Sequence, residues 1–402
     1  MATGDEAADV SADVSANVSP SATEDPHSSS EPARELVVGV NLLWCLPGEV
    51  GGSEEYLVRQ LTGLHEGGPN IRATLFVLPG FAAAHRDLAS QHEVVVASLD
   101  ARRRSRRVWS EATWLPRRLH GIDVVHHAGG TVPPRSPGPI VLTVHDLQYR
   151  TYPGYLTSTK RRYLQVSVPR SVHRARVVAV PTRYVRDTVV EAFGTDPEQV
   201  VVVPHGVDPP VTWTDEATLR RRHHLGQRRL LVYPAITHPH KNHRLLFDLL
   251  SGPWGDPDLL LVMLGSTGLA EQEVAATIER LRLGARVIRP GRVTDADRDG
   301  FIAAAEALVF PSEYEGFGAP VLEAMSLGTP VVCSDRAALP EVAGDAALVR
   351  PLTVEAWATA LDEVAAHRDE LAAAGRRRAA WFTTKGSGAR LAEAYRLAAS
   401  AR

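Results

Sequence analysis

From Leu36 onward, short apolar runs rich in Val and Leu alternate with longer stretches whose apolar residues recur every three or four positions. The short runs are bounded by Gly, Pro or Asp and have the length of strands, whereas the longer stretches have the spacing of amphipathic helices. This alternation is typical of parallel strands joined by crossover helices, so the pattern predicts an α/β fold. The expected strands are Leu36–Val40, Thr74–Leu78, Val94–Ala97, Ile140–Val144, Val177–Val180, Val200–Val203, Leu230–Tyr233, Leu259–Leu264, Ala307–Phe310 and Pro330–Cys333.

Three other segments break this alternation. Residues 1–34 are acidic, contain no Leu, Ile or Phe, and repeat a four-residue pattern, which predicts a disordered tail. Between the two sets of strands, residues 204–210 and the Arg-rich stretch after them indicate a linker, so we expect two α/β domains with a cleft between them. Near the end, 353–374 has helical spacing, and a last helical stretch carries Leu391 and Tyr395.

Composition narrows the class of protein. With 402 residues the chain has room for two ordinary domains, and its 44 basic and 47 acidic residues give a net charge of -3, which leaves no electrostatic footprint for nucleic acid. Two cysteines are too few for a disulfide framework. No apolar run approaches the roughly 20 residues of a membrane span, and the amino terminus lacks a signal-peptide pattern, so we expect a cytoplasmic protein.

The segment from 305 to 341 contains the most informative candidate site. An apolar run precedes a Gly-rich turn and a short helical stretch, in which Pro320 suits the helix start and Gly328 the position just past its end. Ligands bind at the carboxyl ends of strands in open α/β sheets, and free amides at a helix start attract anions. Glu315 and Glu323 therefore stand where carboxylates can accept hydrogen bonds from sugar hydroxyls. On spacing alone, Glu315 can equally end a strand and Glu323 solvate a helix face.

A second candidate follows the first strand of the second half. Lys241 lies where a loop enters a helix, so its ammonium and the helix amides can converge on a diphosphate, although a solvated charge is the alternative interpretation. The nearby His238, His240 and His243 can suggest a metal site. Pro239 interrupts their spacing and no acid is paired with them, which disfavours a metal there.

Two loops of the first half bring polar or glycine residues to other strand ends. Gly51 and Gly52 follow the first strand, and adjacent glycines let the backbone approach a ligand closely. His145 and Asp146 directly follow Ile140–Val144, where a core histidine is the alternative for His145.

Several common motifs are absent or have a local explanation. No G-x-G-x-x-G follows a strand, and no phosphate-loop motif ending in Gly-Lys-Ser or Gly-Lys-Thr occurs, which disfavours hydride transfer and nucleotide hydrolysis. Of the two D-x-D patterns, we interpret 256–258 as a turn and 295–297 as part of a helix cap begun by Thr294.

Together these segments resemble the retaining glycosyltransferases of family 4, which have the GT-B fold. The resemblance extends from Leu36 to the last helix, and its most specific part is the E-x7-E element formed by Glu315 and Glu323. In that family the first Glu contacts the transferred sugar, the amides after it hold sugar hydroxyls and phosphate, and the second Glu binds the ribose. The resemblance assigns the amide role to Gly316, Phe317, Gly318 and Ala319.

Other family elements have counterparts in the first domain and in the loop before the second helix. By resemblance, Gly51 and Gly52 match the family's Gly-rich loop, His145 matches its strand-end histidine near the donor sugar, and Lys241 matches its phosphate-binding lysine.

One position departs from the family pattern. Many relatives have Gly-Arg shortly before the lysine, whereas this chain has Ala235 and Ile236. We hypothesise that Thr237 or His238 partly replaces the missing Arg, which leaves Lys241 as the principal side-chain cation for the diphosphate.

The resemblance implies a fold, a domain plan and a reaction. We expect an acceptor-binding Rossmann-like domain over 35–208, a nucleotide-sugar-binding one over 209–384, and a helix over 385–402 that returns to the first domain. The reaction implied is transfer of a hexose from a GDP-mannose-like or UDP-hexose donor to a hydroxyl acceptor, with retention and without a metal or other cofactor. Glu315, Lys241 and His145 are the expected catalytic residues.

Two other function classes and one partner stay open at this point. A nucleotide-sugar epimerase of GT-B fold would change the donor without an acceptor, and a non-catalytic sensor would bind the donor without turnover. The basic segment 102–119, which contains Trp109 and Trp114, has the composition of a surface that contacts anionic lipid, which would place the protein at the inner membrane face. A solvated charged face is the alternative.

Overall fold

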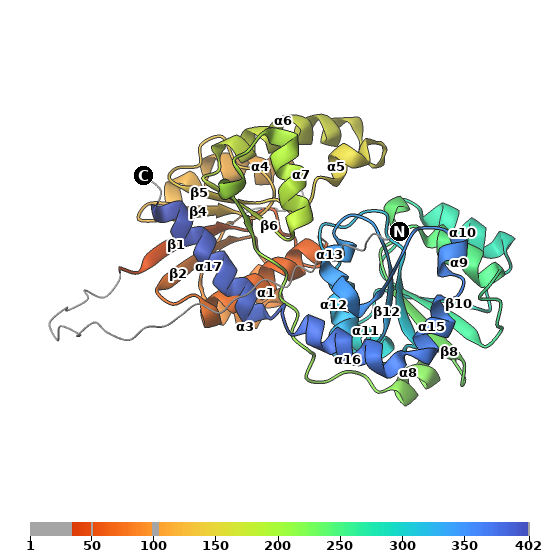
Figure 1. The fold of residues 1–402 in the computed structure, drawn as a ribbon. Coiled ribbons are helices and arrows are strands. Elements are labelled where there is room, and N and C mark those ends of the chain that lie inside the picture. Colours follow the sequence, from red (N-terminus) through yellow and green to blue (C-terminus); the bar gives the residue numbers. More distant parts are fainter. Residues whose placement is uncertain (1–33, 50, 99–103, 401–402) are drawn as a thin grey trace, which may run out of the picture. The chain divides into compact units, whose positions relative to one another are not determined.

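The computed structural model describes residues 34–49, 51–98 and 104–400. Within these ranges the chain forms two all-parallel sheets, each covered by helices (Figure 1). The first has the order β3-β2-β1-β4-β5-β6-β7 and the second β10-β9-β8-β11-β12-β13. The strands are β1 (Leu36–Asn41), β2 (Ile71–Val77), β3 (Glu93–Val96), β4 (Val124–His127), β5 (Ile140–Thr143), β6 (Val177–Val180), β7 (Val200–Val202), β8 (Arg229–Pro234), β9 (Leu259–Leu264), β10 (Val287–Gly291), β11 (Ala307–Phe310), β12 (Val331–Ser334) and β13 (Leu348–Arg350).

The longer connections between strands contain helices, as is usual for crossovers between parallel strands. In the first domain these are α1 (Gly52–Gly67), α2 (Phe81–Ala84), α3 (Arg86–Gln91), α4 (Arg104–Thr113), α5 (Gln148–Thr151), α6 (Ser158–Arg174) and α7 (Arg183–Phe193). In the second they are α8 (Glu216–Arg222), α9 (His243–Ser251), α10 (Glu271–Arg280), α11 (Asp295–Ala304), α12 (Ala319–Leu327), α13 (Leu339–Ala343), α14 (Val354–Trp357), α15 (Ala360–Ala366) and α16 (Arg368–Ala379), and α17 (Thr384–Ser400) follows.

The predicted α/β class with two Rossmann-like parallel sheets is confirmed. Every predicted apolar run contains a strand, and all six residues of β9 are buried, as expected for a strand covered on both faces. The prediction omitted β4, β10 and β13, which are short or carry polar residues. The tail predicted over 1–34 lies, except for Arg34, outside the described residues.

Two stretches differ from their prediction. The Arg-rich part of the expected linker forms α8, because Asp215 caps its first turn through Thr218 N and Leu219 is buried against the second core. The single helix expected over 353–374 is divided into α14, α15 and the start of α16. Within that region Trp357 is fully buried and donates a hydrogen bond to Pro351 O at 2.9 Å.

The last helix returns to the first domain, as predicted. α17 crosses α1 so closely that a Cβ added to Gly63 would lie 1.9 Å from Thr384 O. A Cβ on Gly388 would lie equally close to Gly63 C, so both helices need glycine at the crossing. Further along α17, the Tyr395 hydroxyl lies 2.8 Å from His126 Nδ1 on β4.

The strand orders place two crevices. In the first sheet the order reverses between β1 and β4, and in the second between β8 and β11. Connections leave such neighbouring strands toward opposite faces, so a crevice forms at their carboxyl ends, where ligands bind in open α/β sheets. The loops that follow β1, β8 and β11 contain most of the candidate residues.

Candidate active site

The first predicted carboxylate and the predicted phosphate lysine form an ion pair. Lys241 Nζ lies 2.5 Å from Glu315 Oε1, and the two side chains are 17% and 13% exposed. Lys241 ends a short 3-10 turn, and Asn242, with φ of 49°, redirects the chain into α9. Tyr233 of β8 holds this turn by donating from its hydroxyl to Lys241 O. The ammonium and the carboxylate, 74 residues apart in sequence, therefore meet at the β8/β11 crevice.

The turn between these groups and α12 depends on two glycines. A Cβ on Gly316 would lie 2.2 Å from His145 O, and one on Gly318 would lie 2.5 Å from Leu339 Cδ2. Gly318 also has a φ of 93°, which favours glycine. Ala319 is the first residue of α12, so the amides around it have no partner within the helix and carry the positive end of its dipole.

Phe317, predicted to contribute through its amide, has a buried side chain in a stack of rings. His205 lies between Phe317 (centroids 4.2 Å apart, planes 7°) and Tyr56 (3.9 Å, 20°). This stack joins α1, the segment between the two sheets and the glycine turn. The side chain of Phe317 therefore has a structural role, and only the backbone of Phe317 remains available to a ligand.

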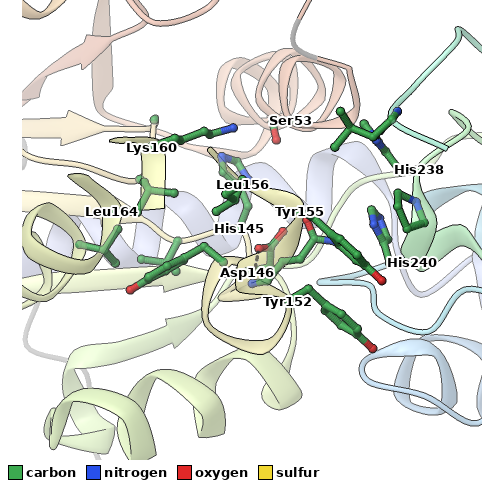
Figure 2. A pocket seen from close by; sticks show the side chains of 18 residues that line it. Ser53, His145, Asp146, Tyr152, Tyr155, Leu156, Lys160, Leu164, His238 and His240 are labelled. Atoms are coloured by element: carbon green, nitrogen blue, oxygen red, sulfur yellow. Dashed lines mark hydrogen bonds between the residues drawn. The ribbon is translucent and has the colours of Figure 1, made fainter. Parts of the chain in front are cut away.

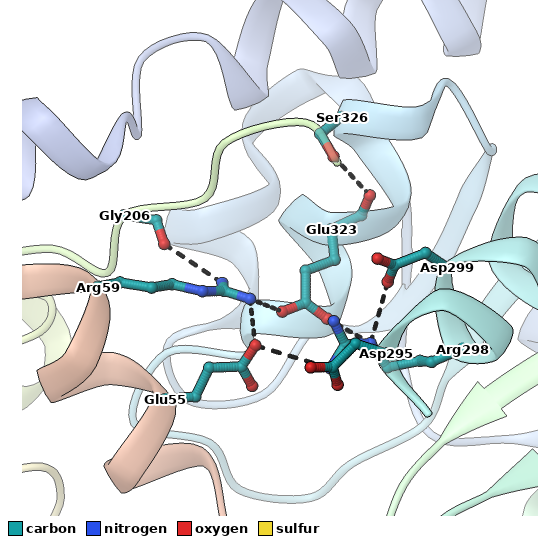
Figure 3. Close-up of polar contacts among 8 residues, drawn as sticks. All are labelled: Glu55, Arg59, Gly206, Asp295, Arg298, Asp299, Glu323 and Ser326. Atoms are coloured by element: carbon teal, nitrogen blue, oxygen red, sulfur yellow. Dashed lines mark hydrogen bonds and ion pairs between the residues drawn. The ribbon is translucent and has the colours of Figure 1, made fainter. Parts of the chain in front are cut away.

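Glu323, the second predicted carboxylate, lies in an ionic cluster shared by both domains (Figure 3). Its side chain is 9% exposed, and Oε1 accepts a hydrogen bond from Arg59 Nη2 of α1 at 2.8 Å. Arg298 Nε lies 4.0 Å from Oε2. Burial would raise the pKa of Glu323, but Arg59 and Arg298 hold that pKa below its usual range. The carboxylate of Glu323 is thus ionised, and its Oε2 is the oxygen that does not accept a hydrogen bond from Arg59.

A second acid of this cluster has the opposite tendency. Glu55 accepts from Arg59 and lies 3.6 Å from Arg298 Nη1, yet burial and the charge of Glu323 raise its pKa.

His145 and Asp146 lie at the end of β5, where the sequence predicted polar groups. His145 Nε2 is 3.0 Å from Ala128 O, so this nitrogen carries the proton and Nδ1 is left as an acceptor. Burial lowers the pKa of His145 to about 4, so the imidazole is neutral at pH 7. Burial raises the pKa of Asp146, whose Oδ1 accepts from Gln148 N at 2.8 Å. Both side chains line a cavity of about 360 Å³ (Figure 2).

The glycine loop after β1 contacts the second domain. Gly51, with φ of 71°, and Gly52 border open space, since a Cβ on either would meet no atom within 4 Å. Earlier in the loop, Gly48 N donates to Glu54 Oε2 at 2.8 Å, and Gly48 O accepts from Arg292 Nη1 at 2.5 Å. The loop is thus anchored at its start and open at its glycines, where a ligand can approach the backbone.

The side chain of Thr237 is engaged within its own domain. Its hydroxyl donates to Glu271 Oε2 at 2.9 Å and accepts from Gly268 N at 2.6 Å. To donate to a diphosphate, the Thr237 hydroxyl would have to give up its hydrogen bond to Glu271. The hypothesis that Thr237 or His238 replaces the missing Arg stays a prediction.

The D-x-D patterns have local roles, as interpreted from the sequence. Asp297 N donates to Thr294 Oγ1 at 3.1 Å in a helix cap, and Asp258 N donates to Asp256 Oδ1 at 2.8 Å in a turn. Among the described residues, no group of three or more His, Cys, Asp or Glu side chains is arranged to hold a metal ion.

The basic segment 102–119 is described only in part, since 102–103 lie outside the described residues. α4 leaves Trp109 64% exposed, whereas Arg118 lies 4.1 Å over the ring of Trp114. Within the described ranges no helix is both long and apolar enough to cross a bilayer.

Sequence reasoning missed Arg59 and Arg298. Arg59 lies on the same face of α1 as Glu55, four residues earlier, so a local surface ion pair would explain it. No spacing rule connects it to Glu323, 264 residues away. Tyr152, Tyr155 and Lys160, which line the cavity with His145, were also not predicted.

Two family models match the chain, one over each sheet. "Glycosyltransferase Family 4" matches residues 50–210, and "Glycosyl transferases group 1" matches residues 215–380. Among curated proteins, the O-antigen chain mannosyltransferase B of Escherichia coli is 29% identical over 232 residues, 56% of this chain. The MMP alpha-(1->4)-mannosyltransferase of Mycolicibacterium hassiacum is 31% identical over 174 residues, 42% of this chain. The alignments span 61% and 40% of these two relatives.

Solved structures share the two-domain architecture. The sucrose-phosphate synthase of Thermosynechococcus elongatus aligns with a TM-score of 0.72 at 19% identity, covering 90% of this chain and 98% of its own. HepE of Anabaena, solved with UDP and glucose, aligns with a TM-score of 0.70 at 20% identity, covering 89% and 98%. The two family models and this shared fold show that the chain belongs to the glycosyltransferases with the GT-B fold, of the family 4 type.

Proposed function

We propose that the chain transfers a hexose from a nucleoside-diphosphate sugar to a hydroxyl acceptor, with retention of anomeric configuration. One observation supports this above the others: Lys241, Glu315 and the first amides of α12 converge at the β8/β11 crevice. A departing nucleoside diphosphate concentrates negative charge on its oxygens, and a preorganised ammonium with helix amides stabilises such charge.

Each group has a separate role in the proposed transfer. Lys241 and the amides of Gly316–Ala319 bind the diphosphate, Glu315 accepts hydroxyls of the transferred sugar, and Glu323 Oε2 accepts ribose hydroxyls. His145, neutral and with Nδ1 as acceptor, orients the donor sugar. The anomeric C–O bond to phosphate breaks as the acceptor oxygen bonds to that carbon, and the acceptor proton passes to the leaving phosphate. These chain groups supply the positive charge, so the proposal includes no metal.

A donor screen followed by product analysis tests this function. We expect one or more of the UDP-, GDP-, dTDP- and ADP-sugars to raise the melting temperature, because a ligand that binds the folded state stabilises it. The mannosyltransferase relatives favour a mannosyl donor such as GDP-mannose, and a UDP-hexose is the alternative. NMR of the product should show the donor's anomeric configuration, and activity should survive EDTA. An isomerised donor formed without acceptor would contradict transfer.

We also propose that α4 contacts anionic lipid at the cytoplasmic face of the membrane. Trp109 is 64% and Val108 40% exposed on a helix that also carries arginines, a combination suited to an acidic interface. Flotation with phosphatidylglycerol vesicles tests this. W109S should bind them less, and neutral vesicles should bind neither protein.

A further inference from the structure

The cavity of about 360 Å³ adjoins the proposed donor site and shares His145 with it. Neither Glu315, Lys241 nor Glu323 lines it. One wall is the first domain's segment from α5 to α6, and the other is the loop His238–His240, directly before Lys241. Its volume is within the usual range for small-molecule sites, so a second substrate can lie against the loop that holds the donor phosphate.

Four nearly parallel rings extend along this cavity. Tyr152 and Tyr155 have planes 6° apart and centroids 5.2 Å apart. Tyr155 and His240 follow at 30° and 6.2 Å, and His240 and His238 at 19° and 5.7 Å. Burial, followed by the charge of Lys241, lowers the pKa of His240 to about 3, so it contributes a neutral ring. Aromatic faces are electron-rich and attract the C–H face of a sugar ring.

Lys160, on the first turn of α6, adds a positive charge to this cavity. It is exposed, and no carboxylate of the described chain lies within ion-pair distance of its ammonium. Its charge nevertheless affects the pKa of two groups that line the cavity. Burial raises the pKa of Asp146 and Lys160 opposes that rise, while burial and the charges of Lys241 and Lys160 lower the pKa of His238. Among the described residues that line the cavity, Lys160 is the side chain positively charged at pH 7, so it can bind an anionic group.

Two further groups that line the cavity can accept hydrogen bonds. His145 Nδ1 is an acceptor, and Asp146 has a second carboxylate oxygen besides the one bonded to Gln148 N. Asp146 would repel an anion but accepts hydroxyls. The cavity thus offers an acceptor for hydroxyls at Asp146 and a cation for an anionic group at Lys160 (Figure 2).

We propose that this cavity is the acceptor subsite and that it selects a pyranose carrying a phosphate. The sugar ring lies against the stacked rings of Tyr155 and Tyr152, its hydroxyls face Asp146, and the phosphate binds Lys160. The inference rests on the proposed transferase function, since it names the acceptor of that reaction.

Binding of sugar phosphates to the full chain, saturated with the nucleoside diphosphate found in the donor screen, tests the proposal. The nucleotide occupies the donor phosphate site, so added sugar phosphates report on the second site. Glucose 6-phosphate and mannose 6-phosphate would be compared by calorimetry with glucose, mannose and glycerol 3-phosphate. We expect at least one hexose phosphate to bind about 10-fold more tightly than both its neutral hexose and glycerol 3-phosphate.

Three variants separate the two contacts. K160A should abolish the preference for the phosphate, and Y155A the preference for a ring over glycerol 3-phosphate, whereas Y155F should keep it. The exposed Arg162 on the same turn does not line the cavity, so R162A is the matched control and should bind as the parent does. A polyprenyl-phosphate-linked sugar is tested in the same way. If both it and the free hexose phosphates bind more tightly than the neutral sugar, recognition of a sugar phosphate is supported. If only the linked form binds more tightly, the acceptor is a lipid-linked sugar phosphate.

The outcomes distinguish this inference from the function on which it rests. Equal binding of hexose and hexose phosphate in every form, or a preference that survives K160A, overturns the acceptor assignment while nucleotide binding and transfer still stand. Failure of every nucleotide to bind overturns the proposed function instead.

Discussion

Replacing Arg59 by Gln tests whether the two domains are joined through the predicted ribose carboxylate. Arg59 on α1 donates to Glu323 Oε1 at 2.8 Å, and this carboxylate is nearly buried. Removing one partner of a buried ion pair destabilises a protein by about 3 to 5 kcal/mol. Arg59 is 21% exposed and Arg298 stays within 4.0 Å of the other oxygen, so we expect the lower end, about 3 kcal/mol.

The assay is denaturant unfolding of the parent, R59Q, E323Q and the double variant. A pair in contact should show a coupling free energy of about 2 kcal/mol, so the double variant should lose less stability than the two single losses added together. R390Q breaks an exposed pair with Glu393 and is the matched control, which should lose under about 1 kcal/mol. Additive losses would refute the reasoning.

The pH dependence gives an independent check with a defined sign. Arg59 and Arg298 hold the pKa of Glu323 below its usual range against the effect of burial. The stability that comes from this depressed pKa is present above about pH 4.3, the usual value for Glu, and is lost as pH falls through the folded-state pKa. The difference in unfolding free energy between the parent and R59Q should therefore be largest near pH 7 and shrink below pH 4. A difference independent of pH would mean that the arginine acts by packing alone.

Three further predictions concern the donor site and the buried histidines. K241A should lower turnover by roughly 10²- to 10³-fold, the scale of losing one preorganised donor, and near-normal turnover of a folded K241A would remove Lys241 from the mechanism. E323Q should weaken nucleoside-diphosphate binding by about 1.5 to 3 kcal/mol in calorimetry, whereas unchanged affinity would contradict a ribose contact. Burial lowers the pKa of His126 to about 3 and that of His145 to about 4, so the unfolded chain binds more protons between those values and about 6.5, and the unfolding free energy should fall steeply as pH is lowered through that range. Replacing His126 by Gln should reduce that slope by about 1.4 kcal/mol per pH unit, as measured in the same unfolding assay.

The fold could be predicted because its strands are buried on both faces and therefore appear as continuous apolar runs. β4 was missed because half of it is histidine. In the structure His126 Nε2 lies 2.7 Å from Thr143 Oγ1 and its Nδ1 reaches Tyr395, so a neutral, fully bonded imidazole occupies a core position. Such bonding depends on a helix that begins more than 250 residues later and leaves no trace in local periodicity.

The contact between Glu315 and Lys241 in the proposed donor site was predictable for a topological reason. Glu315 and Lys241 each follow a strand, and parallel strands end at the same edge, so knowledge of the strands alone brings the two residues together. Arg59 lies within a helix, and no local rule indicates which element its charged face meets.

The two halves of the crevice differ in how their charges are used, and this difference bears on specificity. In the second domain Lys241 is paired with Glu315, and Glu323 is bound by Arg59 and approached by Arg298, so the charges of the proposed donor site are balanced before any ligand binds. In the first domain Lys160 has no such partner among the described residues, and the cavity that it lines also contains Asp146 and the aromatic rings of Tyr152 and Tyr155. A ligand that binds such a site must replace existing ion pairs and hydrogen bonds with its own. This favours a ligand with a defined set of charged groups, such as a diphosphate. In the proposed acceptor cavity the unpaired ammonium of Lys160 favours a ligand that carries a negative charge. Changes at Lys160 and Tyr155 should therefore alter acceptor choice without disturbing donor binding.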